Sequence, residues 1–128
     1  MNVPDNLKYT EEHEWIKVEG KTAVVGITDY AQKALGDITF VELPSVGQAV
    51  AKGDEVGSVE SSKAASSIYA PAGGKVVEVN DALEDQPELV NADPYDGGWM
   101  YKLALSNPDD AAGLMDAAAY QALSEEED

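Results

Sequence analysis

The chain has 128 residues and a mass of 13.6 kDa, which is the size of a single domain. Its eight basic residues, all Lys, against 25 Asp and Glu give a formal net charge of −17. Such a charge argues against nucleic acid and anionic membrane surfaces as ligands, because both need a cationic surface. Cysteine is absent, which excludes disulfides, thiolate metal sites and cysteine catalysis. With His13 as the single histidine, we expect no metal site and no catalytic residue.

The N-terminus lacks the basic and apolar segments of a signal peptide, and no segment is apolar over the length of a membrane span. We therefore expect a cytoplasmic protein, or a protein of the mitochondrial matrix if this sequence is the mature form of a eukaryotic one.

The first half of the chain predicts a hairpin, a helix and two further strands. Apolar and polar residues alternate in the strand segments. Thr28 is an N-cap residue type and Gly36 suits a C-cap, so a helix is predicted between them. The predicted elements are a β-hairpin of residues 14–18 and 22–27, a helix of residues 29–35, and strands of residues 38–43 and 55–60.

The second half predicts three more strands and a helical C-terminus. The predicted strands are residues 66–70, 75–80 and 99–105, with a loop over 83–95 that contains one helical turn at 88–90. A helical segment is expected from residue 107 to about 123, and residues 124–128 are expected to form a solvated, disordered acidic tail. Short strands separated by Gly and Pro turns indicate a mainly β fold, a small sandwich or barrel with short helices.

Lys63 lies between two predicted strands, in a segment of small residues. Glu60, Ser61, Ser62 and Ala64 surround it without a bulky side chain. Such a lysine would stand at a hairpin tip, open to a modifying enzyme, where a covalent cofactor arm can move between sites. On composition alone, a solvated turn lysine is the more ordinary interpretation. A Schiff-base lysine is less favoured, because the nearby charge is the carboxylate of Glu60.

Short segments in a fixed order make the chain similar to the H-protein family of the glycine cleavage system, from residue 7 to about residue 120. No single segment decides the resemblance, but their order and spacing together make it specific. The matching segments are residues 13–15, 26–32, 35–37, 40–44, 59–61, 63–64, 74–80, 89–91, 93–95 and 98–99.

The resemblance implies one lipoyl-carrier domain over residues 1–128, with a core of about 7–120. Its fold would be the barrel-sandwich hybrid of lipoyl and biotinyl carriers, a hybrid β-sandwich with short helices that include a C-terminal helical segment. Lipoate would be amide-linked to Lys63 as N6-lipoyllysine, and the protein itself would catalyse nothing.

The resemblance also implies the partners. In this family the lipoyl group accepts an aminomethyl group from glycine at a pyridoxal-phosphate glycine decarboxylase (P protein). An aminomethyltransferase (T protein) passes the carbon to tetrahydrofolate, and a dihydrolipoamide dehydrogenase (L protein) restores the disulfide with NAD. A lipoate ligase, or a lipoyl or octanoyl transferase, would attach the lipoate.

Two residues near the lysine depart from the family's usual pattern. Ser62 stands where Val is usual, a change that should leave attachment intact, and Ser67 stands where Asp is common. Glu14 matches a position at the cleft that shelters the loaded arm in this family, where it could pair with the ammonium group of the adduct. Ser67 carries no charge, so it could not help Glu14 to pair with that ammonium group.

Other functions stay open at this stage. A lipoyl domain of a 2-oxoacid dehydrogenase complex commonly has Asp before its lysine, whereas Ser62 stands here. An H-like protein that relays lipoate to other proteins fits the same sequence. In an unmodified acidic binding module, Lys63 would be only a turn lysine. The negative charge would steer a carrier onto basic docking surfaces, or would serve solubility alone.

Overall fold

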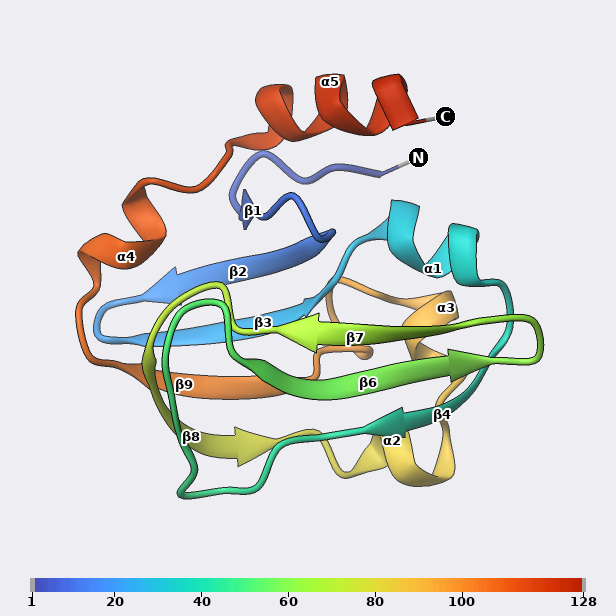
Figure 1. Ribbon diagram of the computed structural model, residues 1–128, viewed down its shortest axis with the longest axis horizontal. Coiled ribbons are helices and arrows are strands. Elements are labelled where there is room, and N and C mark those ends of the chain that lie inside the picture. The colour runs from blue at the N-terminus through green and yellow to red at the C-terminus, as the bar shows by residue number, and fades with distance from the viewer. Residues whose placement is uncertain (1, 128) are drawn as a thin grey trace.

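Two antiparallel sheets enclose the main hydrophobic core of the computed structural model, which describes residues 2–127 (Figure 1). The six-stranded sheet consists, in order across it, of β1 (Lys8–Tyr9), β2 (Glu14–Glu19), β3 (Thr22–Ile27), β9 (Tyr101–Leu105), β8 (Gly74–Val79) and β5 (Ala49–Val50). The three-stranded sheet consists of β4 (Ile38–Glu42), β6 (Glu55–Ser61) and β7 (Ala65–Tyr69). The helices are α1 (Asp29–Leu35), α2 (Ala82–Asp85), α3 (Leu89–Ala92), α4 (Asp109–Ala112) and α5 (Ala117–Glu127).

The core between the sheets is built from the inward-facing residues of both. Side chains alternate across a strand, so every second residue of each strand faces the partner sheet. Buried core residues include Ile16, Val25 and Leu103 of the larger sheet and Val59 and Ile68 of the smaller one. This arrangement confirms the expected mainly β fold of two small sheets with short helices.

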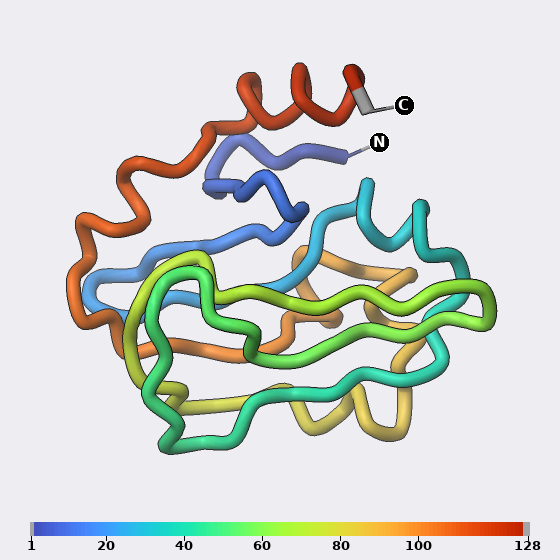
Figure 2. Tube along the Cα trace, in the orientation of Figure 1, coloured from blue at the N-terminus to red at the C-terminus, as the bar shows by residue number. Residues whose placement is uncertain are grey.

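A second apolar cluster lies on the opposite face of the larger sheet, under α5. Trp15 follows the alternation of β2 and points away from Ile16, into this cluster. The Tyr120 ring of α5 stacks on Tyr9 with ring centroids 4.7 Å apart. The Cα trace shows α5 lying alongside the N-terminal segment (Figure 2). The C-terminal helix is therefore part of the packed domain.

The predicted helix over residues 29–35 is confirmed, with both of its caps. The Oγ1 of Thr28 accepts a hydrogen bond from the N–H of Ala31 at 3.2 Å. Gly36 ends the helix with φ +82°, a conformation that residues with a side chain rarely adopt. The predicted hairpin of residues 14–27 is also present, as β2 and β3.

The segment before the last strand differs from its prediction at two points. The helical turn predicted at 88–90 is present as α3, which buries Val90, but a second short helix, α2, begins the predicted loop and buries Leu83. The last strand begins at Tyr101 rather than at residue 99. The Asn80 side-chain amide donates to the carbonyl of Trp99 at 2.8 Å, so that carbonyl is bound outside the strand ladder.

The C-terminus also differs from its prediction. The single helical segment over 107–123 is interrupted between α4 and α5, where Met115 forms an antiparallel bridge with Tyr9. The residues expected as a disordered tail continue α5 through Glu127, and Ser124 is buried; residue 128 lies outside the described residues. No helix within residues 2–127 is long and apolar enough to cross a membrane.

Candidate functional site

Lys63 lies in the turn that joins β6 to β7, at the free end of the three-stranded sheet (Figure 1). The N–H of Ser61 donates to the carbonyl of Ala64 at 2.8 Å and closes the turn. The Oγ of Ser61 accepts from the N–H groups of Lys63 at 3.3 Å and of Ala64 at 3.1 Å. Ser62, Lys63 and Ala64 are all exposed. The turn therefore fixes the backbone under Lys63 and leaves its side chain accessible.

The stem of Lys63 passes over Gly36, at the end of α1. Its Cε lies 3.3 Å from the position that a Cβ on Gly36 would occupy. Asn91 of α3 holds this region, because its Nδ2 donates to the carbonyl of Gly36 and its Oδ1 accepts from the N–H of Ile38, both at 2.8 Å. The sequence did not indicate this role of Asn91, since Asn91 lies more than 50 residues after Gly36 and Ile38 in the chain.

Glu60, expected as part of the context of the modified lysine, lies in β6 directly opposite Phe40 of β4 and Ala65 of β7. Its side chain is exposed. The ion pairs among the described residues join other side chains, so neither Glu60 nor Lys63 takes part in one. The amine of Lys63 is therefore not held by a carboxylate in this part of the chain.

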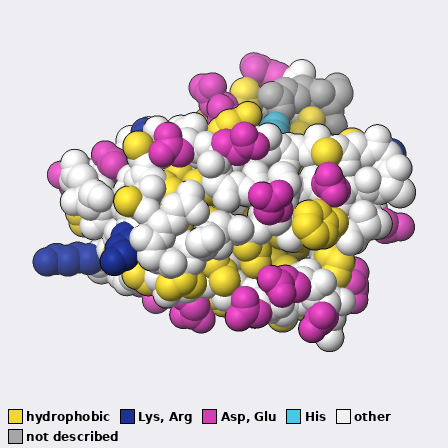
Figure 3. Space-filling view, turned by 60° about the horizontal axis from the view of Figure 1, so that its bottom comes forward, with side chains coloured by type: hydrophobic (Ala, Val, Ile, Leu, Met, Phe, Trp, Pro, Cys, Tyr) yellow, Lys and Arg dark blue, Asp and Glu magenta, His cyan; other side chains and the backbone are white. Residues whose placement is uncertain are grey.

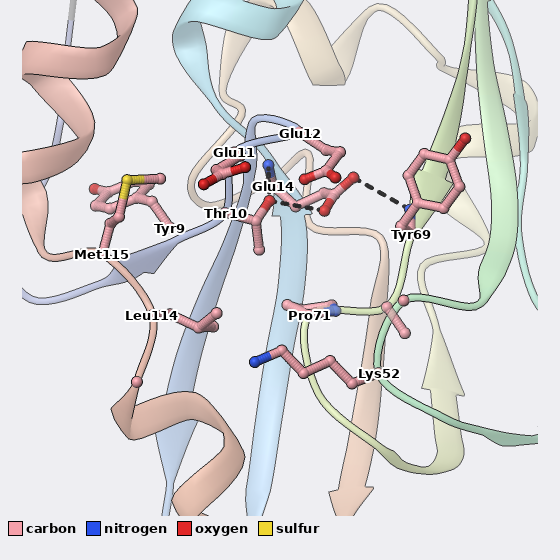
Figure 4. A pocket seen from close by; sticks show the side chains of 13 residues that line it. Tyr9, Thr10, Glu11, Glu12, Glu14, Lys52, Tyr69, Pro71, Leu114 and Met115 are labelled. Atoms are coloured by element: carbon pink, nitrogen blue, oxygen red, sulfur yellow. Dashed lines mark hydrogen bonds between the residues drawn. The ribbon is translucent and has the colours of Figure 1, made fainter.

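Glu14, at the start of β2, is buried, with 1% of its surface exposed. Thr10 Oγ1 donates to one carboxylate oxygen at 2.8 Å, and the N–H of Tyr69 donates to the other at 3.1 Å (Figure 4). Burial, and to a smaller extent the charge of Glu12, raises the pKa of Glu14 to about 7, although the two hydrogen bonds oppose the rise. The carboxyl group of Glu14 therefore changes from its protonated to its charged form near neutral pH.

A cleft of about 450 Å³ opens beside Glu14. Glu11, Glu12 and Glu14 line one side of it, and the side chain of Lys52 extends below Pro71 (Figure 4). Three carboxyl groups against one ammonium make the cleft suited to a cationic ligand. The lining residues are Tyr9, Thr10, Glu11, Glu12, Glu14, Lys52, Gly53, Tyr69, Ala70, Pro71, Gly113, Leu114 and Met115. Thr10, Glu12 and Lys52 carried no signal in the sequence by which this position could be found.

The structure does not bring Lys63 and Glu14 into contact. They lie at opposite ends of β7, because Lys63 precedes the strand and Tyr69, the partner of Glu14, ends it. Six residues of extended chain span about 20 Å. Ser67, within β7, is half-buried and is not among the residues that line the cleft.

His13 precedes Glu14 and packs against the C-terminal helix. It has φ +69°, its ring stacks on Tyr30, and its Nδ1 lies 2.8 Å from the hydroxyl of Tyr120. These contacts give His13 a place in the scaffold that supports β2. No group of three or more His, Asp or Glu side chains within the described part of the chain is placed to hold a metal ion.

A family model described as Glycine cleavage H-protein matches residues 7–127. The chain belongs to this family. It is 55% identical over 128 residues to the glycine cleavage system H protein of Anaeromyxobacter sp. (strain K), with 100% of both chains covered. A relative of the same name from Laribacter hongkongensis is 58% identical over 121 residues, which cover 94% of this chain and 95% of the relative.

A solved structure matches the fold as well. The crystal structure of a glycine cleavage system H protein from Mycobacterium marinum has a TM-score of 0.89 and 40% sequence identity, covering 96% of this chain and 99% of that chain. This match confirms the barrel-sandwich fold of lipoyl carriers. As a glycine cleavage H-protein, the chain is a non-catalytic carrier of lipoate bound to a lysine, and it works with the P, T and L proteins of the system.

Proposed function

We propose that Lys63 is the lysine to which lipoate is attached, as N6-lipoyllysine. The observation that supports this most is its position: an exposed amine on a turn held by Ser61, in no described ion pair. Lys21 also lies in a hairpin turn, between β2 and β3, and serves as the matched control. The small side chains of Ser62 and Ala64 leave room for an enzyme to approach Lys63 from several directions.

The lipoyl group, when bound, supplies a disulfide that accepts the aminomethyl group derived from glycine. The residues of this chain hold and present it. Lys63 provides the amide nitrogen, and the turn closed by Ser61 and Ala64 joins that side chain to the three-stranded sheet. We propose a lipoate ligase, or a lipoyl or octanoyl transferase, as the enzyme that forms the amide. The proposed compartment is the cytoplasm, which the bacterial origin of the relatives supports.

Glu14 is proposed to receive the cationic end of the loaded arm in the cleft. The support is a buried carboxyl with a pKa of about 7, flanked by Glu11 and Glu12. A cation beside Glu14 favours its charged form, so binding would displace the proton and create an ion pair shielded from water. The arm has to lie extended along β7 to reach it. Ser67 does not line the cleft, so the carboxyl groups that would receive the cation are those of Glu11, Glu12 and Glu14, whether residue 67 is Ser or Asp.

The attachment site is tested by intact-protein mass and peptide mapping of chain from cells that contain lipoate and a lipoate ligase. We expect the mass of one lipoyl group on Lys63, its loss in Lys63→Arg, and its retention in the matched turn variant Lys21→Arg. A wild-type chain without modification, or a modified Lys63→Arg chain, would contradict the proposal.

The role of Glu14 is tested with the loaded wild-type protein and Glu14→Gln. We expect the variant to be loaded by glycine decarboxylase and to lose the aminomethyl group to water faster than wild type. Equal rates of loss in the two proteins would exclude the role of Glu14 in sheltering the arm.

A further inference from the structure

The outer face of the three-stranded sheet carries an exposed aromatic side chain next to the lysine turn. Phe40 is 51% exposed, and in the sheet it lies opposite Glu60, which in turn lies opposite Ala65. Lys63 is in the turn between Glu60 and Ala65, and the strand spacing places the Cα of Phe40 about 10 Å from that of Ala65, two residues after Lys63. A large apolar side chain thus lies within reach of any enzyme that acts on this lysine.

A groove of about 520 Å³ runs from Phe40 toward α2. Apolar side chains line it together with the carboxylates of Glu42 and Glu84, and Glu60 lies beside Phe40. All three carboxylates are exposed, and the ion pairs among the described residues are formed by other side chains. The remaining lining residues are Val41, Leu43, Pro44, Ser45 and Val79.

The space-filling view from this side shows apolar side chains gathered over the lower part of the molecule, with acidic side chains spread around them (Figure 3). An apolar centre with a charged border is the usual composition of a protein interface. The acidic border here selects for a partner whose matching surface is basic. We call Phe40, the groove and the carboxylates of Glu42, Glu60 and Glu84 the Phe40 surface.

We propose that the Phe40 surface is the docking site for the enzyme that attaches lipoate to Lys63, and that this enzyme presents an apolar recess bordered by Lys and Arg. The proposal rests on the proposed modification of Lys63. It adds the surface by which the modifying enzyme recognises the unmodified chain.

The length of the lysine side chain decides between this enzyme and the partners that act later. Before modification, the amine of Lys63 extends only four methylene groups from the backbone. An enzyme that acylates it has to bring its reacting atoms to the turn itself, and its body then covers the adjoining sheet face. The later partners act at the end of a longer arm and can stand farther from Phe40. The enzyme that attaches lipoate therefore has to contact the Phe40 surface, whereas the later partners do not.

The test measures initial rates of lipoylation by a purified lipoate ligase with lipoate and ATP, over a range of concentrations of unmodified chain. The test variants are Phe40→Ser and Glu84→Lys. The control for the first is Val18→Ser, a 41% exposed apolar strand residue of the other sheet. The control for the second is Glu126→Lys on α5, which changes the net charge by the same amount at an exposed site.

We expect Phe40→Ser to raise the KM for the chain about tenfold and Glu84→Lys to raise it several-fold, with kcat unchanged. Val18→Ser and Glu126→Lys should keep the KM of wild type. A KM within about twofold of wild type for both test variants, or equal rises in the controls, would overturn the proposal.

Two further measurements distinguish a failure of the proposed docking site from a failure of the proposed modification of Lys63. A wild-type chain that is not modified on Lys63 contradicts the proposed function itself, before any variant is compared. Fully lipoylated Phe40→Ser is then assayed with glycine decarboxylase, where we expect the rate of wild type. A large loss there, with lipoylation unaffected, would assign the Phe40 surface to the decarboxylase and overturn the inference.

Discussion

The carboxylate of Glu14 accepts a hydrogen bond from the backbone N–H of Tyr69 at 3.1 Å, across 55 residues of sequence. Glu14 begins β2 in the larger sheet and Tyr69 ends β7 in the smaller one, so this bond joins the two sheets at the mouth of the cleft. A buried carboxyl in such a place has a pKa that depends on the fold, and its titration is therefore measurable in the stability of the protein.

We expect the contribution of Glu14 to the stability of the protein to decline as the pH rises from about 4.5 to about 7. Burial raises the pKa of Glu14 from its ordinary value of 4.5 to about 7. Between pH 4.5 and pH 7 the folded protein therefore binds more protons than the unfolded chain. The free energy of unfolding then falls as pH rises from about 4.5 to 7, by at most about 3 kcal/mol. Urea unfolding of wild type and Glu14→Gln at pH 5 and pH 8 measures it. The variant should lack this decline, and parallel pH dependences would contradict the assignment.

Gly26→Ala should destabilise the protein although the backbone at this position accepts an alanine. Gly26 lies directly opposite Trp15 in the β2–β3 pair, and a Cβ there would stand 2.7 Å from the indole ring. The ring is buried and donates through Nε1 to the carbonyl of Pro94, so a shift of the ring away from the new Cβ would break that hydrogen bond. We expect a loss of about 2 kcal/mol.

The matched control for this substitution is Gly20→Ala. Gly20 has φ +66° and nothing within 4 Å of a Cβ, so alanine there meets only backbone strain. Its cost should be about 1 kcal/mol. Urea unfolding with tryptophan fluorescence compares the two; a smaller loss for Gly26→Ala than for Gly20→Ala would show that the indole ring adapts.

Tyr120→Phe should destabilise the protein by about 1–2 kcal/mol, because it removes a buried hydroxyl that serves two partners. That hydroxyl lies 2.6 Å from Thr28 Oγ1 and 2.8 Å from Nδ1 of His13, so it joins α5 to the cap of α1 and to the residue before Glu14. Thermal unfolding measures the loss. Tyr69→Phe is the control at an exposed ring, and equal effects of the two substitutions would contradict a special role for the Tyr120 hydroxyl.

The rates of transfer between the lipoylated chain and its partner enzymes should fall as ionic strength rises. A net charge of −17 attracts basic docking surfaces over a distance that salt shortens to about 10 Å at 0.1 M. We expect kcat/KM with glycine decarboxylase to drop about tenfold between low and high salt, with kcat nearly constant. A flat kcat/KM would mean that the charge serves solubility rather than encounter.

The elements that sequence reasoning located are those whose signals are local. The helix between Thr28 and Gly36 was found because both caps stand within one segment. The turn at Lys63 was found because two alternating strands meet at small residues. The two-residue strands β1 and β5 were missed, since such a short strand has no periodicity and exists only through its partner.

The sequence by itself determined the mainly β class, the turn that exposes Lys63, and the family resemblance that made Glu14 a candidate. Only the tertiary structure decided the environment of Glu14, where Tyr69 supplies the N–H and burial sets the pKa. It also decided that residues 124–127 are helical, because Tyr120 packs α5 onto Tyr9. The reason is the same in both cases: a local signal lies in neighbouring residues, whereas burial and hydrogen bonding between distant segments exist only once the two sheets have packed.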